Sequence, residues 1–127
     1  MKIAIIFLDY LRKDYSQRAL ESIIRGNYPF DLFTIQRKGI SSALNEGIDK
    51  TKDYDGVVTC ANDIEMPINW LREMVDFASA IPNTGMCGIH CVESKENPIE
   101  VNGKLICPSF TAFGNVLLPR KAIDTIG

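Results

Sequence analysis

The sequence predicts a single α/β layer domain built on a mainly parallel central sheet. Apolar runs of strand length alternate with amphipathic helical stretches through the first two-thirds of the chain, and the last third is richer in strands. This alternation is typical of a sheet that is covered by helices. The 127 residues, 46% of them apolar, suffice for one hydrophobic core and are too few for two domains. We therefore expect one domain over residues 1–127.

Periodicity and stop signals define the elements of the first two-thirds. The expected strand at residues 2–8 continues from Lys2 into an unbroken apolar run, of the kind that a parallel sheet buries on both faces. Gly26-Asn27 and Pro82-Asn83 are helix stop signals, and Ser41 is the expected cap of the second helix. Trp70 belongs to an apolar helix stripe and is expected in the core. The expected order is strand 2–8, helix 14–25, strand 31–36, helix 41–50, strand 56–60, helix 70–81 and strand 84–92.

The last third is expected to contain a β-hairpin and one further strand. Asn102-Gly103 supplies the positive φ angles of a tight turn within residues 99–106. Residues 111–118 form another apolar strand, and Pro119 is expected to open a last helix.

Composition narrows the class of protein. The net charge of −2 gives no basic footprint for nucleic acid, and no apolar run approaches the ~18 residues of a membrane span. The apolar start resembles a signal peptide but reaches Asp9 without a small-residue cleavage site, which indicates a buried strand instead. We expect a cytoplasmic domain that binds no nucleic acid.

The four cysteines, at positions 60, 87, 91 and 107, have two interpretations. Cys87, His90 and Cys91 are residue types that bind zinc. On a strand, however, His90 would face away from both sulfurs, which would lie roughly 13 Å apart, too far for a disulfide. Buried, reduced cysteines are therefore the favoured interpretation.

Polar residues follow the first three expected strands. The strand ends read Leu8-Asp9-Tyr10, Gln36-Arg37-Lys38 and Ala61-Asn62-Asp63. Ligands of parallel α/β sheets bind at the carboxyl ends of the strands. Two ends with an aspartate and one with two cations suit a phosphate ligand bridged by a divalent metal.

Three stretches of the chain, taken in order, resemble the large, mostly inverting, family 2-like group of GT-A nucleotide-sugar glycosyltransferases. Residues 39–48 resemble its G-x-s-x-A-x-N-x-G-I helix, residues 57–71 its metal-binding strand and loop followed by p-x-x-W-L, and residues 114–127 its later strand and helix. The resemblance implies a GT-A-like, Rossmann-like three-layer sandwich. It also implies transfer of a sugar from a nucleoside-diphosphate sugar to a glycan or other acceptor hydroxyl.

The resemblance implies that Asp63 is the metal ligand. Asp63 aligns with the last acid of the D-x-D signature, while Ala61 and Asn62 stand at its first two positions. The implied cofactor is Mn²⁺ or Mg²⁺, which stabilises the departing diphosphate. Glu65 either helps to bind the metal or is an exposed loop carboxylate.

The resemblance also implies donor contacts at the first two strand ends and in the helix that follows the second strand. Tyr10 is expected to stack on a base or to act as a helix-entry staple, and Gln36 stands where the family's base-reading acid is expected. Asp9 and Asn45 each suit either a donor contact or a local structural role. The complete expected nucleotide-sugar-binding set is Leu8, Asp9, Tyr10, Arg12, Gln36, Arg37, Lys38, Asn45, Asn62 and Asp63. Arg12, Arg37 and Lys38 would meet phosphate.

The chain reaches Gly127 where the family continues into the segment of its catalytic carboxylate. We therefore expect a C-terminally truncated domain without the family's base, and the catalytic residues are unassigned. Self-association is expected through apolar surface near Phe110, Phe113 and Ile123. The alternative functions are a catalytically inert GT-A-like binding module and another doubly wound regulatory domain, such as a flavodoxin-like or receiver-like one.

Overall fold

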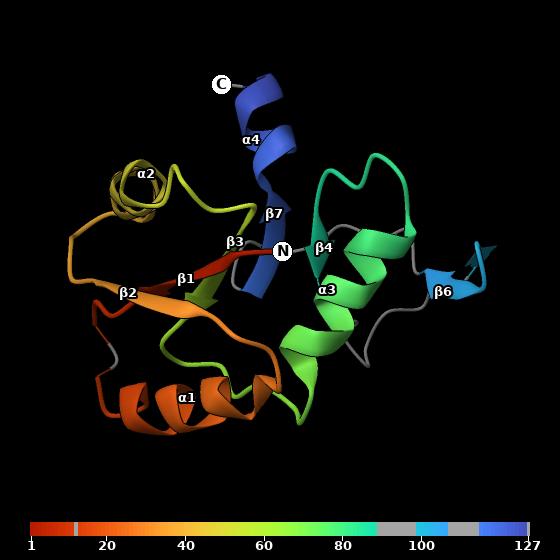
Figure 1. The fold of residues 1–127 in the computed structure, drawn as a ribbon. Coiled ribbons are helices and arrows are strands. Elements are labelled where there is room, and N and C mark those ends of the chain that lie inside the picture. The colour runs from red at the N-terminus through yellow and green to blue at the C-terminus, as the bar shows by residue number, and fades with distance from the viewer. Residues whose placement is uncertain (12, 89–98, 107–114, 127) are drawn as a thin grey trace.

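The computed structural model describes residues 1–11, 13–88, 99–106 and 115–126. Their main feature is a five-stranded sheet in the order β2-β1-β3-β7-β4 (Figure 1). The strands are β1 (Ile3–Leu8), β2 (Asp31–Ile35), β3 (Gly56–Ala61), β4 (Cys87–Gly88) and β7 (Asn115–Pro119). β1 pairs in parallel with β2 and β3, while β7 runs antiparallel to both β3 and β4. All the strands except β7 thus point the same way, which confirms the predicted mainly parallel sheet.

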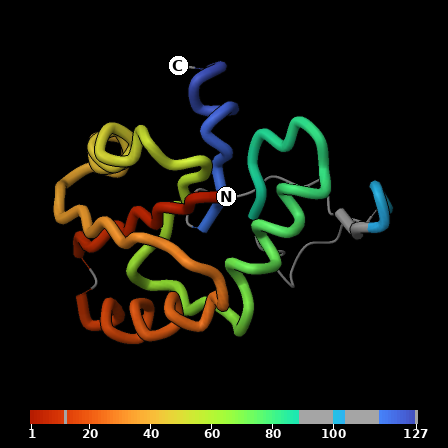
Figure 2. Tube along the Cα trace, in the orientation of Figure 1, coloured from red at the N-terminus to blue at the C-terminus, as the bar shows by residue number. Residues whose placement is uncertain are grey.

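Helices cover both faces of this sheet. α1 (Ser16–Ile23), its short extension η1 (Ile24–Gly26) and α3 (Trp70–Ala80) contribute to one core, while α2 (Ile40–Lys50) and α4 (Arg120–Ile126) contribute to the other. In Figure 1, α1 lies below the sheet, and α2 and α4 lie above it. The predicted three-layer arrangement is therefore confirmed. Figure 2 follows the chain from the N-terminus, at the centre of the view, to α4 at the top.

The side chains of β1 alternate between the two cores. Ile3, Ile5 and Phe7 lie in the core with α1 and α3, whereas Ile6 and Leu8 lie in the core with α2. This double burial explains the unbroken apolar run, because polar residues on either face would be removed from water. Each large apolar side chain buried here contributes about 1.5–3 kcal/mol.

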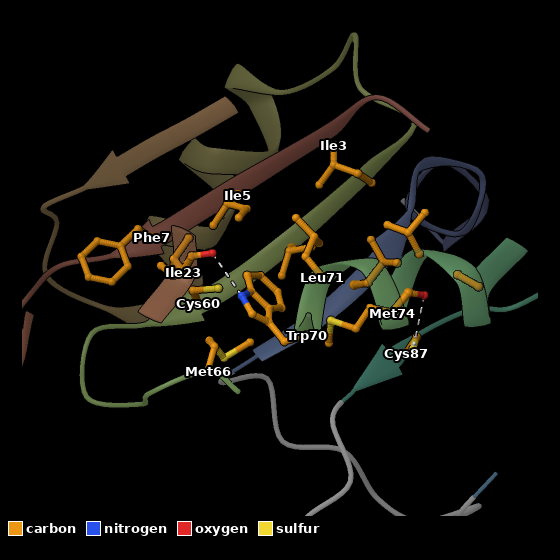
Figure 3. Close-up of a cluster of buried hydrophobic side chains, with 14 of the residues drawn as sticks. Ile3, Ile5, Phe7, Ile23, Cys60, Met66, Trp70, Leu71, Met74 and Cys87 are labelled. Carbon is orange, nitrogen blue, oxygen red and sulfur yellow. Dashed lines mark hydrogen bonds between the residues drawn. The ribbon is translucent and has the colours of Figure 1, made fainter. Parts of the chain in front are cut away.

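Trp70 occupies the centre of the core between α1 and α3 (Figure 3). Its side chain is buried, and its indole N–H donates a hydrogen bond of 3.1 Å to the Ile23 carbonyl. A Cβ atom at Gly26 would lie 2.8 Å from the Leu71 Cβ and 3.0 Å from the indole nitrogen. Only glycine therefore permits this close approach, and the predicted core role of Trp70 is confirmed.

The approach of α2 to the sheet also depends on a glycine. A Cβ atom at Gly47 would lie 2.6 Å from two side-chain carbons of Ile6. The backbone of α2 is thus in close contact with the Ile6 side chain of β1.

Several element boundaries differ from the prediction. α2 begins at Ile40, one residue before Ser41, and its N-cap is Gly39 with φ 91° and no side-chain capping bond. The expected Ser41 cap is therefore wrong, because the glycine makes the turn into the helix. Pro119 ends β7 instead of opening α4. Of the predicted strand 84–92, β4 contains only Cys87–Gly88 within the described part, and residues 89–92 lie outside it.

The predicted hairpin is confirmed. β5 (Ile99–Val101) pairs antiparallel with β6 (Lys104–Ile106), and the turn residues Asn102 and Gly103 have φ angles of 49° and 75°. The Asn102 side chain donates to the Ala80 carbonyl at 3.5 Å, which places the hairpin beside the end of α3.

Two of the four cysteines are described, and both are buried free thiols. Burial raises the pKa of Cys60 to about 12 and that of Cys87 to about 11. The other components of the zinc interpretation, His90 and Cys91, lie outside the described residues, as does Cys107. The apolar positions Phe110 and Phe113 also lie outside them, and Ile123 packs partly buried against the core beside α2.

Candidate functional site

The ends of β1, β2 and β3 lie side by side because of their register. Leu8 is paired with Ile35 on one side and with Ala61 on the other. The next residue of each strand is therefore brought to one edge of the sheet. These three residues are Asp9, Gln36 and Asn62, and the structure joins their side chains directly.

The Asp9 carboxylate is the centre of this group. Its Oδ1 accepts hydrogen bonds from Ser16 Oγ at 2.6 Å and from Asn62 Nδ2 at 3.3 Å. Its Oδ2 accepts from Gln36 Nε2 at 3.2 Å and lies 3.7 Å from Lys13 Nζ. Four donors thus surround a residue that is only 9% exposed. A carboxylate has about four lone-pair positions, so hydrogen bonds within the protein engage three of those of Asp9.

These donors hold Asp9 in its charged form. The hydrogen bond from Ser16 lowers the pKa of the carboxyl most; burial opposes it, and Gln36, Asn62 and Lys13 lower it further. A carboxylate with a lowered pKa is a weak general base, and both oxygens of Asp9 already accept hydrogen bonds within the protein. Between the two sequence-based alternatives, the geometry favours the structural role for Asp9.

Asn62 points inward from the same edge. It is 5% exposed, and its Nδ2 donates to the Leu11 carbonyl at 2.6 Å as well as to Ser16 Oγ at 3.2 Å. Leu11 is in the left-handed region with φ 60°, an unusual conformation for a branched residue. The sequence-based set did not include Ser16 or the Leu11 carbonyl. The alternation of side chains along a strand could have predicted that Asn62 points inward. Asn62 is two residues beyond Cys60, and Cys60 faces the core on the α1 side.

Asp63 has the opposite environment. Its side chain is exposed and makes no ion pair or hydrogen bond with the described residues. The loop that carries it is fixed at both ends, by buried Asn62 and by Met66, whose N–H donates to buried Ser22 Oγ at 2.8 Å. Nearby Glu65 is exposed and forms an ion pair with Arg18. The loop therefore presents to solvent, from a fixed backbone, a carboxylate that is unpaired among the residues that the structure describes.

The remaining expected residues are only partly gathered at this edge. Leu8 packs against the core beside α2, which favours a structural role, whereas Tyr10 is 41% exposed. Arg12 lies outside the described residues. Lys38 is exposed and makes no ion pair within the described part of the chain.

Arg37 and Asn45 belong to a neighbouring surface. Arg37 lies 3.6 Å from Glu46, which also bonds Lys50 at 2.7 Å. Together with Asn45 these side chains line a shallow, open groove along α2. Asn45 is exposed and has no hydrogen bond within the described residues, so its predicted capping role has no support there.

The residues present fit a divalent cation that is shared with a phosphate ligand. No cluster of three or more His, Cys, Asp or Glu side chains able to hold a metal occurs among the described residues. Mg²⁺ commonly uses one or two protein carboxylates and completes its shell with water and substrate phosphate oxygens. A single free carboxylate at Asp63 meets that requirement.

A mainly parallel sheet with helices on both faces defines a doubly wound type of α/β domain, in which ligands bind at the carboxyl ends of the strands. The model of the family Glycosyl transferase family 2 matches residues 1–126. The chain therefore belongs to glycosyl transferase family 2, which confirms the GT-A-like fold and supports a glycosyltransferase-like function.

One solved structure similar to this chain is that described as A197 from STIV. The TM-score is 0.57 at 14% identity, and the match covers 100% of this chain and 69% of that one. At this identity the likeness concerns the fold. No curated protein matches the chain in sequence. None of the helices in the described residues has the length and apolar character needed to cross a membrane.

Proposed function

We propose that this chain binds a nucleoside-diphosphate sugar at the carboxyl edge of β1, β2 and β3 and takes part in transfer of the sugar to an acceptor hydroxyl. The observation that carries the proposal is the exposed Asp63 carboxylate, which has no partner among the described residues and lies on a loop fixed by two buried anchors. Membership of glycosyl transferase family 2 supports the same reaction class.

Asp63 would hold Mn²⁺ or Mg²⁺ against the diphosphate. When bound, the ion supplies neutralisation of the charge that develops on the leaving group. Lys38, exposed and unpaired within the described residues, follows β2 and supplies a cation at the same edge of the sheet. Arg37 must exchange its contact with Glu46 for one with a phosphate. The two side chains are 3.6 Å apart and partly exposed, so loss of this ion pair costs little free energy.

Donor binding without turnover is the second candidate function. Asp9 accepts three hydrogen bonds and has a lowered pKa, which disfavours it as the base that deprotonates an acceptor. Glu65 is paired with Arg18 in the free protein. The two candidates share the same donor site and differ only in whether sugar is transferred to an acceptor.

Calorimetry with UDP, GDP and dTDP tests the donor site. We expect binding in Mn²⁺ that weakens at least about tenfold, or 1.4 kcal/mol, in chelator. Asp63→Ala should abolish this metal dependence. The control is Asp76→Ala, which removes another exposed carboxylate, on α3, and should bind like the unchanged chain. Equal affinity in Mn²⁺ and in chelator would contradict the proposal, as would absence of binding to all three nucleotides.

A screen of nucleotide sugars against pooled acceptor glycans then separates the two candidates. Release of nucleoside diphosphate with formation of a glycosylated acceptor supports transfer. Metal-dependent binding without product supports the binding role.

A further inference from the structure

We propose that Asn62 is a positioning residue that sets the conformation of the β1–α1 loop, and through it donor affinity, without binding the metal or the donor itself. The consequence for affinity rests on the proposed function. The effect on the loop does not, and it is measurable in the free protein.

The contacts of Asn62 point to the protein interior. Its Nδ2 group lies within hydrogen-bond distance of three oxygens: the Leu11 carbonyl at 2.6 Å, Ser16 Oγ at 3.2 Å and Asp9 Oδ1 at 3.3 Å. An amide group has only two hydrogens, so both hydrogens of Asn62 Nδ2 have acceptors within the protein. The residue is 5% exposed, which leaves little of it accessible to a ligand.

The Leu11 backbone, which Asn62 contacts, is not held in place by its own side chain. Leu11 adopts φ 60°, which a branched side chain disfavours, and its own side chain is 66% exposed. Packing therefore does not select this conformation. The hydrogen bond to the Leu11 carbonyl is the shortest contact of the Asn62 amide group, and it ties the loop to the end of β3.

The adjacent residues Asn62 and Asp63 have different roles in this arrangement. Asn62 continues the alternation of β3 and turns toward α1, while Asp63 turns out to solvent. The loop that Asn62 secures also carries Tyr10, which is 41% exposed at the same edge. Asn62 thus couples the loop holding Asp63 to the loop presenting Tyr10.

The chemistry of the contacts requires an amide at position 62. An aspartate there would place a carboxylate 3.3 Å from Asp9 Oδ1 and 2.6 Å from the Leu11 carbonyl, with no hydrogen to donate. If Asn62 were a metal ligand instead, aspartate would be the stronger one. Asn62→Asp therefore gives opposite results under the two assignments.

The test combines amide exchange by NMR with nucleoside-diphosphate titrations of Asn62→Asp, Asn62→Ala and the control Asn83→Asp. Asn83 is an exposed residue after α3 with φ 59°, so its variant repeats the chemical change away from the site. We expect both position-62 variants to speed exchange of the Ser16 amide, bonded to the Lys13 carbonyl at 3.2 Å, at least about tenfold. Nucleotide affinity should fall at least tenfold, and the ratio of affinities in Mn²⁺ and chelator should stay unchanged.

Stronger Mn²⁺-dependent binding by Asn62→Asp would overturn the proposal, and so would unchanged exchange in residues 9–16. If the position-62 variants do not fold, Ser16→Ala removes one contact each of Asn62 and Asp9 and should give a smaller effect in the same direction. Failure of the unchanged chain to bind any nucleotide refutes the proposed function, and the exchange rates then decide the positioning role alone.

Discussion

Gln36 Nε2 lies 3.2 Å from Asp9 Oδ2, so side chains as well as main-chain bonds join the ends of β2 and β1. The contact engages the side-chain amide of Gln36, and Gln36 stands where the family's base-reading acid is expected. We therefore predict poor discrimination between UDP, GDP and dTDP, with affinities within about tenfold of one another. Competition titrations measure this, and a stronger preference for UDP would show that another group reads the base.

The stability of the domain should depend on Asp9 in acid. Its pKa is lowered in the folded state, so its contribution to the free energy of unfolding is complete above the ordinary pKa. That contribution is lost as the pH falls below about 4, through the lower native value. Denaturant unfolding at several pH values should show a shallower acid loss for Asp9→Asn. Asp76→Asn, at an exposed position on α3, should retain the full acid dependence.

Gly47→Ala should destabilise the domain by about 1–3 kcal/mol, because the new methyl group would lie 2.6 Å from Ile6. The matched control is Gly85→Ala, where no atom lies within 4 Å of the added Cβ. Urea unfolding of the two variants measures the difference, and equal stability would contradict the close packing of α2 on β1.

The described cysteines should resist modification in the folded protein. Burial raises the pKa of Cys60 to about 12 and of Cys87 to about 11, and the thiolate is the reactive form. In a chain with Cys91→Ser and Cys107→Ser, thiol labelling should require unfolding. Rapid stoichiometric labelling at neutral pH without denaturant would show that these side chains are accessible.

The layer order, the hairpin and the core position of Trp70 were predictable because each depends on a local pattern. The continuous apolar run of β1, the Asn102-Gly103 turn and the apolar stripe of α3 are all readable over a few residues. The start of α2 was mispredicted because Ser41 is a good cap in isolation, whereas Gly39 with positive φ makes the turn.

The candidate site was less predictable because its contacts join distant parts of the chain. The bond between Asn62 and the Leu11 carbonyl spans 51 residues, and the bond between Gln36 and Asp9 spans 27. Their geometry depends on the register of β1 with both neighbouring strands. The sequence favoured Asp63 as the metal ligand but left Asp9 between a donor contact and a structural role, and the fold shows Asp9 engaged in hydrogen bonds with three other side chains.

Paramagnetic relaxation by Mn²⁺ tests the central claim, which is that Asp63 holds a metal with the donor diphosphate. Asp63 follows the carboxyl end of β3, whereas α4 begins beside Asp55 at the other end, roughly 17 Å away along the strand. With a bound nucleoside diphosphate, amide signals of residues 62–64 should broaden most and those of α4 least, and Asp63→Ala should abolish the pattern. Broadening centred on the groove along α2, or unchanged by Asp63→Ala, would contradict the account.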